Sequence, residues 1–374
     1  MKKLGKILGV GLLGLLGVWV GGLLHAAQTT TPTPTTTWSI GHSVGRVGLL
    51  LLVSLLAIGV HELGHAVLGH WQGFEFQWLT VGPFRWQREA QQIRFRWNTS
   101  LYAAGGLVVS IPLGGHNLRH RYLLFAAGGP LASALLAGVA LSSYALFSSQ
   151  GFSQPIGVGL VLTGAVSGAI ALATLLPLHL GGVASDGARL LTLWRGGPAS
   201  QLELAVLTAT SHSVAGTRPR QLPLTALQAA LTLPDTLPFK PYLYHYLYLA
   251  ALDRGHLEQA AHYLTTYRAC VHQLPALLQE TVWLEAAFFA AAFTQDLTTS
   301  QSFEQQAVAS ALTPADIAFR VAAAQARLLG DAPHARVHAQ ASLRALAHNM
   351  DRGSSVFYAE WLQETLHWAS EQGG

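Results

Sequence analysis

The chain has 374 residues, enough for two domains, and 51% of them are hydrophobic while only 11% are charged. Soluble domains carry roughly a quarter charged residues, so the composition argues against a purely soluble protein. The formal net charge is +4, but the basic residues form no dense run, and we therefore expect no nucleic-acid partner. Cys270 is the only cysteine, which excludes an intrachain disulfide and a thiolate metal site.

The N-terminal 27 residues have the pattern of a membrane-targeting segment. Three lysines precede an apolar stretch from Ile7 to Leu24, which ends in small residues at 26 and 27. This pattern is typical of a retained transmembrane helix and equally of a cleaved signal peptide. Residues 28–45 are rich in Thr and Pro at their start, lack apolar periodicity, and are predicted to be a linker on the outer side of the membrane.

Three further apolar runs are each long enough to cross a bilayer as a helix: 47–68, 122–147 and 156–180. Together with the N-terminal run they predict a polytopic all-α membrane protein with three to four transmembrane helices. The segment 71–121 contains six arginines, whereas 148–155 contains no Lys or Arg. Because basic residues favour the cytoplasmic side, we expect 71–121 and everything after residue 180 to face the cytoplasm of a multi-pass cell-membrane protein.

Two short segments between the second and third runs alternate apolar and polar residues. Phe74–Trp78 and Ile93–Trp97 are separated by Gly82-Pro83, and we interpret them as the two strands of a small membrane-associated β-hairpin. The following stretch, Leu101–Gly115, is apolar but short and interrupted by Gly and Pro. It is predicted to be a re-entrant or interfacial loop.

From residue 198 the chain takes on soluble character and helical periodicity. Two helical hairpins are predicted: Tyr242–Ala251 with Leu257–Arg268, and Ile317–Leu329 with His334–Leu346. They resemble tetratricopeptide pairs, although the 34-residue period of that repeat is not clean. We therefore expect residues 198–374 to form a cytoplasmic α-helical repeat-like domain that docks a protein partner or gates substrate entry, and residues 46–197 to form a separate core.

The second apolar run contains the motif His61-Glu62-Leu63-Gly64-His65. On a helix, residues four apart share a face, so both imidazoles can bind one ion. Glu62 lies beside the pair and can accept a proton from a water that the metal binds. Chance matches to this short motif are common on surface helices, but ionisable groups within an apolar span are functional candidates.

A catalytic zinc needs a third protein ligand. Between residues 63 and 201 the acidic residues are Glu75, Glu89 and Asp186, and the first two belong to the predicted hairpin. Asp186 follows the fourth run at the depth of the histidine pair, although a helix N-cap would also explain an Asp there. His179 remains an alternative third ligand. His70 is expected to face elsewhere on the helix, and His116 and His120 are expected to lie in a basic loop at the membrane interface.

These segments resemble the site-2 protease family of intramembrane zinc metalloproteases. The resemblance rests on the HExxH motif, on Gly128-Gly129-Pro130-Leu131-Ala132-Ser133, and on Leu175-Leu176-Pro177 followed by Ser185-Asp186-Gly187, and it covers about residues 45–195. It implies that His61, His65 and Asp186 bind Zn²⁺ and that Glu62 activates water. It also implies that Gly129, Pro130 and Ser133 help to align the substrate, although Ser133 and Thr174 stand where the family usually has Asn.

The sequence thus predicts an endopeptidase that hydrolyses peptide bonds of membrane-spanning protein substrates. An exposed strand of the hairpin, or the loop at 101–115, can hold an unwound substrate through main-chain hydrogen bonds; a membrane-surface anchor that uses Trp78, Trp86 and Trp97 is the alternative. A catalytically silent scaffold whose helical domain binds a partner is the main rival function. A transporter is disfavoured because the sequence shows no internal inverted repeat.

Overall fold

The computed structural model describes residues 40–89, 92–98, 105–148, 154–180, 183–310 and 313–372. The predicted N-terminal segment 1–27 and most of the predicted linker lie outside these residues. The chain divides into two compact units, one comprising residues 1–110 and 120–194, the other 111–119 and 195–374. Each unit is described here by itself.

Three helices of the first unit are long and apolar enough to cross a membrane. They are α2 (Ile40–Trp71), α3 (Leu118–Phe147) and α4 (Gln154–Leu175), and their candidate spans are Val47–Trp71, Leu118–Phe147 and Pro155–Leu175. All three were predicted from the apolar runs. Helix α2 begins at Ile40, within the range expected to be linker. A short helix, α5 (Asp186–Arg195), follows α4 after two paired two-residue strands, β5 (His179–Leu180) and β6 (Val183–Ala184).

Helices α2 and α3 approach so closely that their backbones touch at a pair of glycines. A Cβ on Gly64 would lie 2.3 Å from the Gly128 carbonyl oxygen, and a Cβ on Gly128 would lie 2.4 Å from that of Gly64. Small residues at such crossings allow the dispersion contacts that hold membrane helices together. A further apolar cluster, to which Val53 and Ala57 of α2 and Leu162 and Val166 of α4 contribute, joins α2 to α4.

A four-stranded sheet with the order β3-β2-β1-β4 accompanies α2. Its strands are β1 (Phe74–Val81), β2 (Phe84–Glu89), β3 (Gln92–Trp97) and β4 (Leu107–Pro112). The predicted pairing of 74–78 with 93–97 is wrong, because β2 lies between them: Trp86 is opposite Leu79 of β1 on one side and Phe95 of β3 on the other. The described part of the predicted loop 101–115 likewise contains strand β4.

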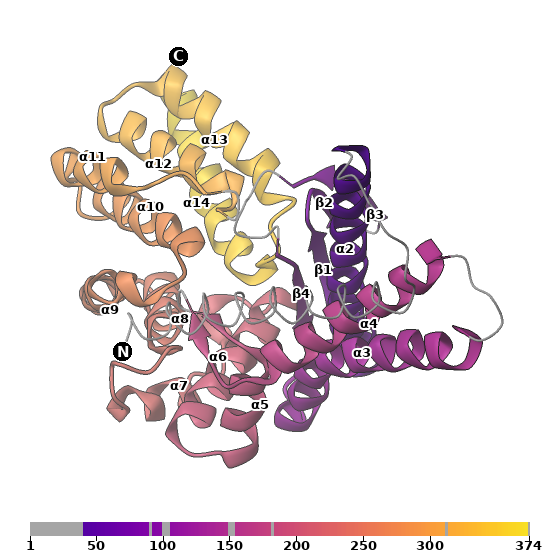
Figure 1. The fold of residues 1–374 in the computed structure, drawn as a ribbon. Coiled ribbons are helices and arrows are strands. Elements are labelled where there is room, and N and C mark those ends of the chain that lie inside the picture. The colour runs from indigo at the N-terminus through magenta and orange to yellow at the C-terminus, as the bar shows by residue number, and fades with distance from the viewer. Residues whose placement is uncertain are drawn as a thin grey trace. The chain divides into compact units, whose positions relative to one another are not determined.

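Strand β1 runs antiparallel to α2 and beside it, as Figure 1 shows. Phe74 packs near Gly69, Val81 packs against Gly59, and the β1–β2 turn at Gly82 meets Leu55. Since these α2 residues belong to the candidate span Val47–Trp71, the β1–β2 hairpin lies alongside that candidate span rather than beyond its end.

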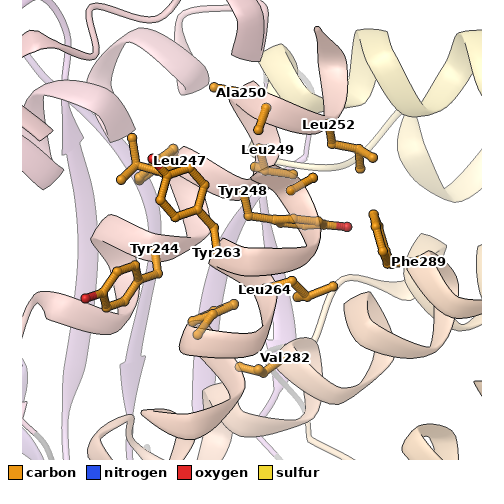
Figure 2. Close-up of a cluster of buried hydrophobic side chains, with 14 of the residues drawn as sticks. Tyr244, Leu247, Tyr248, Leu249, Ala250, Leu252, Tyr263, Leu264, Val282 and Phe289 are labelled. Carbon is orange, nitrogen blue, oxygen red and sulfur yellow. The ribbon is translucent and has the colours of Figure 1, made fainter. Parts of the chain in front are cut away.

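The second unit is helical and has a large apolar core. After α6 (Pro198–Val214) and α7 (Thr225–Ala229) come α8 (Lys240–Asp253), α9 (Leu257–Ala269), α10 (Ala276–Ala292), α11 (Leu297–Gln306), α12 (Ala315–Leu328), α13 (Ala332–Leu346) and α14 (Arg352–Glu371). Figure 2 shows the centre of the core, where Tyr248 of α8 lies near Leu264 and Phe289 of the following helices. The predicted helical hairpins correspond to α8–α9 and α12–α13.

A repeat architecture is not confirmed for this unit. Helix α14 packs back on α6, where the Ser213 hydroxyl lies 2.5 Å from a carboxylate oxygen of Asp351. Arg218 donates hydrogen bonds to Asp253 of α8 and to Glu360 of α14. Stacked repeats contact only their neighbours, whereas here the last helix contacts the first.

Candidate metal centre

Helix α2 presents His61 and His65 one turn apart, with their ring centroids 5.0 Å from each other. Both imidazoles are buried, as is the neighbouring Glu62. Their spacing of four residues on a regular helix explains this common orientation. The HExxH motif therefore forms the face that the sequence predicted.

Asp186, the first residue of α5, completes a three-residue cluster. Its Oδ2 lies 3.2 Å from Nε2 of His61, and its Oδ1 lies 3.4 Å from Nε2 of His65. One ligand atom from each residue lies within 4.8 Å of the others, which makes this group a possible metal site. His179 pairs within β5–β6 and does not belong to the group, so the described residues favour Asp186 over His179 as third ligand.

The remaining ring nitrogens have hydrogen-bond partners that orient both imidazoles. Nδ1 of His65 lies 2.7 Å from the Phe125 carbonyl oxygen. A carbonyl only accepts, so Nδ1 of His65 carries the proton and Nε2 keeps the lone pair that a metal requires. The amide nitrogen of Gly129 lies farther away, at 3.3 Å, and does not alter this assignment. Nδ1 of His61 lies 3.0 Å from the hydroxyl of Ser133.

The Gly-Gly-Pro segment of α3 shapes the space between the two histidines. A Cβ on Gly129 would lie 2.3 Å from Nε2 of His65 and 2.6 Å from Nε2 of His61, so any side chain there would fill the space beside both Nε2 atoms. Pro130 lies inside α3 and cannot donate to the carbonyl four residues earlier, which loosens this turn of the helix. Ser133 is fully buried, and its hydroxyl contacts Nδ1 of His61, so Ser133 helps to orient this imidazole.

Ser185 positions Asp186 by capping α5. Its hydroxyl oxygen accepts from the Ala188 amide at 3.2 Å and the Leu178 amide at 3.1 Å, and donates to the Leu176 carbonyl. Because Ser185 supplies the N-cap, the Asp186 carboxylate is available to face the histidines. Burial raises the pKa of Asp186, but the contacts of its carboxylate with His61 and His65 lower that pKa by more, so the net pKa lies well below its usual range and the carboxyl is ionised at neutral pH.

Strand β4 approaches Glu62. The backbone of Val108 hydrogen-bonds the Glu62 carboxylate, and Gly106 lies against Oε1 of the same side chain. Glu62, the candidate general base, therefore lies between the cluster of His61, His65 and Asp186 and the strand β4 at the edge of the sheet.

Two of the acidic residues considered from sequence lie on the sheet: Glu75 pairs with Arg88, and Glu89 pairs with Arg94 and Arg96. Sequence reasoning missed the roles of Phe125, Val108 and Ser185. The first two act through backbone atoms, which leave no signal in residue type. Ser185 could have been recognised from the preference for Ser at helix N-caps.

A family model described as peptidase family M50 matches residues 49–340. The match reaches well beyond the motifs at 45–195 and includes most of the second unit. Comparison with curated proteins and with solved structures found no match.

Proposed function

The chain belongs to peptidase family M50, which makes it a membrane metalloprotease of the site-2 protease family, and we propose that it is a zinc endopeptidase acting on membrane-spanning proteins. The observation that carries the proposal is the placement of Asp186 against Nε2 of both His61 and His65. We propose these three residues as the zinc ligands and Glu62 as the general base.

The donor set fits zinc. Two neutral imidazoles and one carboxylate are a common ligand set for catalytic zinc and leave one position open. Histidines that bind a metal through Nε2 normally form a hydrogen bond through Nδ1, as His61 and His65 do here. Zinc bound there would polarise the substrate carbonyl and lower the pKa of water.

Glu62 would handle the protons of the reaction. Its carboxylate accepts a proton from the attacking water as the oxygen bonds to the carbonyl carbon, and later delivers that proton to the amine nitrogen as the C–N bond breaks. The hydrogen bond from Val108 holds the carboxylate beside the cluster. This contact also connects Glu62 to β4.

Strand β4 is a suitable place for an extended substrate. It pairs with β1 and forms one edge of the described sheet, and an extended peptide can add to such an edge through main-chain hydrogen bonds. A transmembrane helix must unwind before its amide can be attacked, so an edge beside Glu62 would hold the unwound segment in reach. This supports the edge-strand hypothesis for β4, which lies in the second of the two segments predicted to hold the substrate, residues 101–115, rather than in the hairpin.

The direct test is cleavage of a tagged single-span substrate in proteoliposomes by wild-type and Glu62→Gln protein. We expect Glu62→Gln to retain zinc and to lose at least about a thousandfold in rate, because the proton acceptor is gone. Glu75→Gln, on the sheet, is the matched carboxylate control and should cleave at a rate close to wild type. Equal cleavage by the wild type and Glu62→Gln would refute the role of Glu62, and wild-type protein that binds no zinc would favour the scaffold alternative.

A further inference from the structure

The β2–β3 ribbon has two chemically different faces, and register determines which residues share each face. Phe84 is opposite Trp97 and Trp86 is opposite Phe95, so these rings gather on one face and contact one another. The intervening residues point to the other face, where Arg85 lies opposite Arg96 and Gln87 opposite Arg94. We call Arg85, Arg94 and Arg96 the arginine face.

The arginine face carries more positive charge than the acidic residues of the segment 46–197 can neutralise. Glu89 is shared by Arg94 and Arg96, whose side chains are 60% and 57% exposed. Arg85 stacks on the Trp78 ring at 5.0 Å, and its buried Nε has no hydrogen-bond partner among the described residues. The other acidic residues at 46–197 are Glu62, Glu75 and Asp186. Each has a partner elsewhere: Glu62 contacts β4, Glu75 pairs with Arg88, and Asp186 pairs with His61 and His65.

The position of the ribbon strengthens the need for an external anion. Arg85 is opposite Thr80 of β1, and the adjacent Val81 packs against Gly59 of α2. Because successive strand residues point to opposite faces, the arginine face lies on the side of the ribbon away from the Val81 side chain, at the level of Gly59 within the candidate span Val47–Trp71. Arginines at that depth pair with opposite charge or face a water-filled cavity.

Strand β3 also has the geometry of a docking edge. It is the other edge of the described sheet, and all six of its residues are exposed. Arg94 and Arg96 are two residues apart on one strand, about 6.6 Å along it. Carboxylates at every second position of an extended segment have the same period and, after pairing with the β3 backbone, would lie opposite these guanidinium groups.

We propose that β3 and the arginine face bind an extended acidic segment of the substrate protein, with Asp or Glu at alternate positions. The proposal rests on the proposed function in naming the substrate as the source of the segment. It assigns β4 to the scissile peptide and β3 to a second, charge-selective contact. Arginines that serve only to protect a sheet edge from aggregation would have no preference for the pattern of acidic residues.

The test is fluorescence anisotropy with detergent-purified, full-length Glu62→Gln protein, so that binding is measured without cleavage. One labelled peptide carries Asp at every second position, alternating with Thr and Val; the other has the same residues with the Asp contiguous. We expect the alternating peptide to bind about tenfold more tightly. Arg94→Gln with Arg96→Gln should abolish that preference, and Glu89→Gln should tighten binding, because the competing carboxylate is removed.

Arg88→Gln is the matched control, since Arg88 lies on β2 but pairs with Glu75 on the opposite face, and it should change the affinity less than about twofold. Unfolding temperatures verify that each variant is folded. Equal binding of both peptides, or an equal loss in Arg88→Gln, would overturn the proposal. If phosphatidylglycerol displaces both peptides and the two peptides bind equally tightly, the arginines bind lipid phosphate instead of an acidic segment. None of these outcomes depends on zinc or hydrolysis, so the proposed function is tested separately.

Discussion

The two histidines and Asp186 illustrate what residue type and spacing can predict. The HExxH spacing places both imidazoles on one face of α2, and the scarcity of acidic residues in the core limits the candidates for a third ligand. The contacts that orient the imidazoles could not be predicted from sequence where they involve backbone atoms, such as the Phe125 carbonyl, because any residue type has these atoms. The role of Ser133 in aligning the substrate stays a prediction; its hydroxyl lies 3.0 Å from Nδ1 of His61.

The close approach of Gly129 to both histidines predicts how a substitution there would change zinc affinity. In Gly129→Ala the new methyl group would lie within 2.6 Å of both Nε2 atoms, so we expect the variant to fold and to bind zinc at least about tenfold more weakly. Gly138→Ala on the same helix, where a Cβ meets nothing within 4 Å, is the control. Zinc titration of both variants decides the point, and equal affinity would mean that the ion lies elsewhere.

Among the elements, the membrane helices were predictable and the sheet was not. Long apolar runs identify α2, α3 and α4 because a bilayer requires that length. Alternation in 74–78 and 93–97 identifies strands but contains no information about which strands pair. Strand β2 was overlooked because its sequence, Phe84–Glu89, is largely polar, and β4 because Gly105 and Gly106 precede it and it ends at Pro112.

The α2–α3 crossing is testable by a change of side-chain volume. Gly64→Leu would force apart backbones that touch at Gly128, and overpacking of this kind costs about 1–3 kcal/mol or more. We expect a lower unfolding temperature and weaker zinc binding, because α3 carries the partners of both histidines. Gly48→Leu, on α2 with open space around it, should behave as wild type. Equal unfolding temperatures for the two variants would contradict the observed crossing.

Helix α8 of the second unit contains a histidine whose titration should affect stability. Burial lowers the pKa of His245 below 6.5, and its Nδ1 has no hydrogen-bond partner among the described residues. The unfolded chain therefore binds the proton more readily, and stability is lost as the pH falls below about 6.5. Hydrogen exchange of α8–α10 in the full chain should accelerate between pH 7 and pH 5 after correction for intrinsic rates.

The same exchange measurement on His245→Gln provides the comparison. This variant should show a smaller pH dependence than wild type, whereas the exposed His256→Gln should not differ from wild type. An unchanged pH dependence in His245→Gln would show that another group is responsible.

For the whole molecule, the sequence predicts two parts, and the structure contains two compact units. Periodicity located the helical hairpins α8–α9 and α12–α13, but it could not show that α14 returns to α6, because that contact joins residues far apart in the sequence, such as Ser213 and Asp351. The repeat-like interpretation depended on local similarity alone.

We propose that the second unit is cytoplasmic. Because the chain has a single cysteine, its replacement leaves a background in which one introduced cysteine reports the side of the membrane. In a Cys270→Ser background, His334→Cys on the exposed surface of α13 should react with a membrane-impermeant maleimide in inverted vesicles. It should not react in intact spheroplasts until they are permeabilised. Labelling in intact spheroplasts would place the unit on the outer side and reverse the proposed orientation of the active site.

The most direct measurement is the zinc content of detergent-purified protein, wild type beside Asp186→Ala. We predict a single zinc per chain in the wild type and a large loss in the variant, because Asp186 contacts both histidines. Folded wild-type protein without zinc, or zinc content unchanged by Asp186→Ala, would contradict the metal centre proposed for this membrane protease.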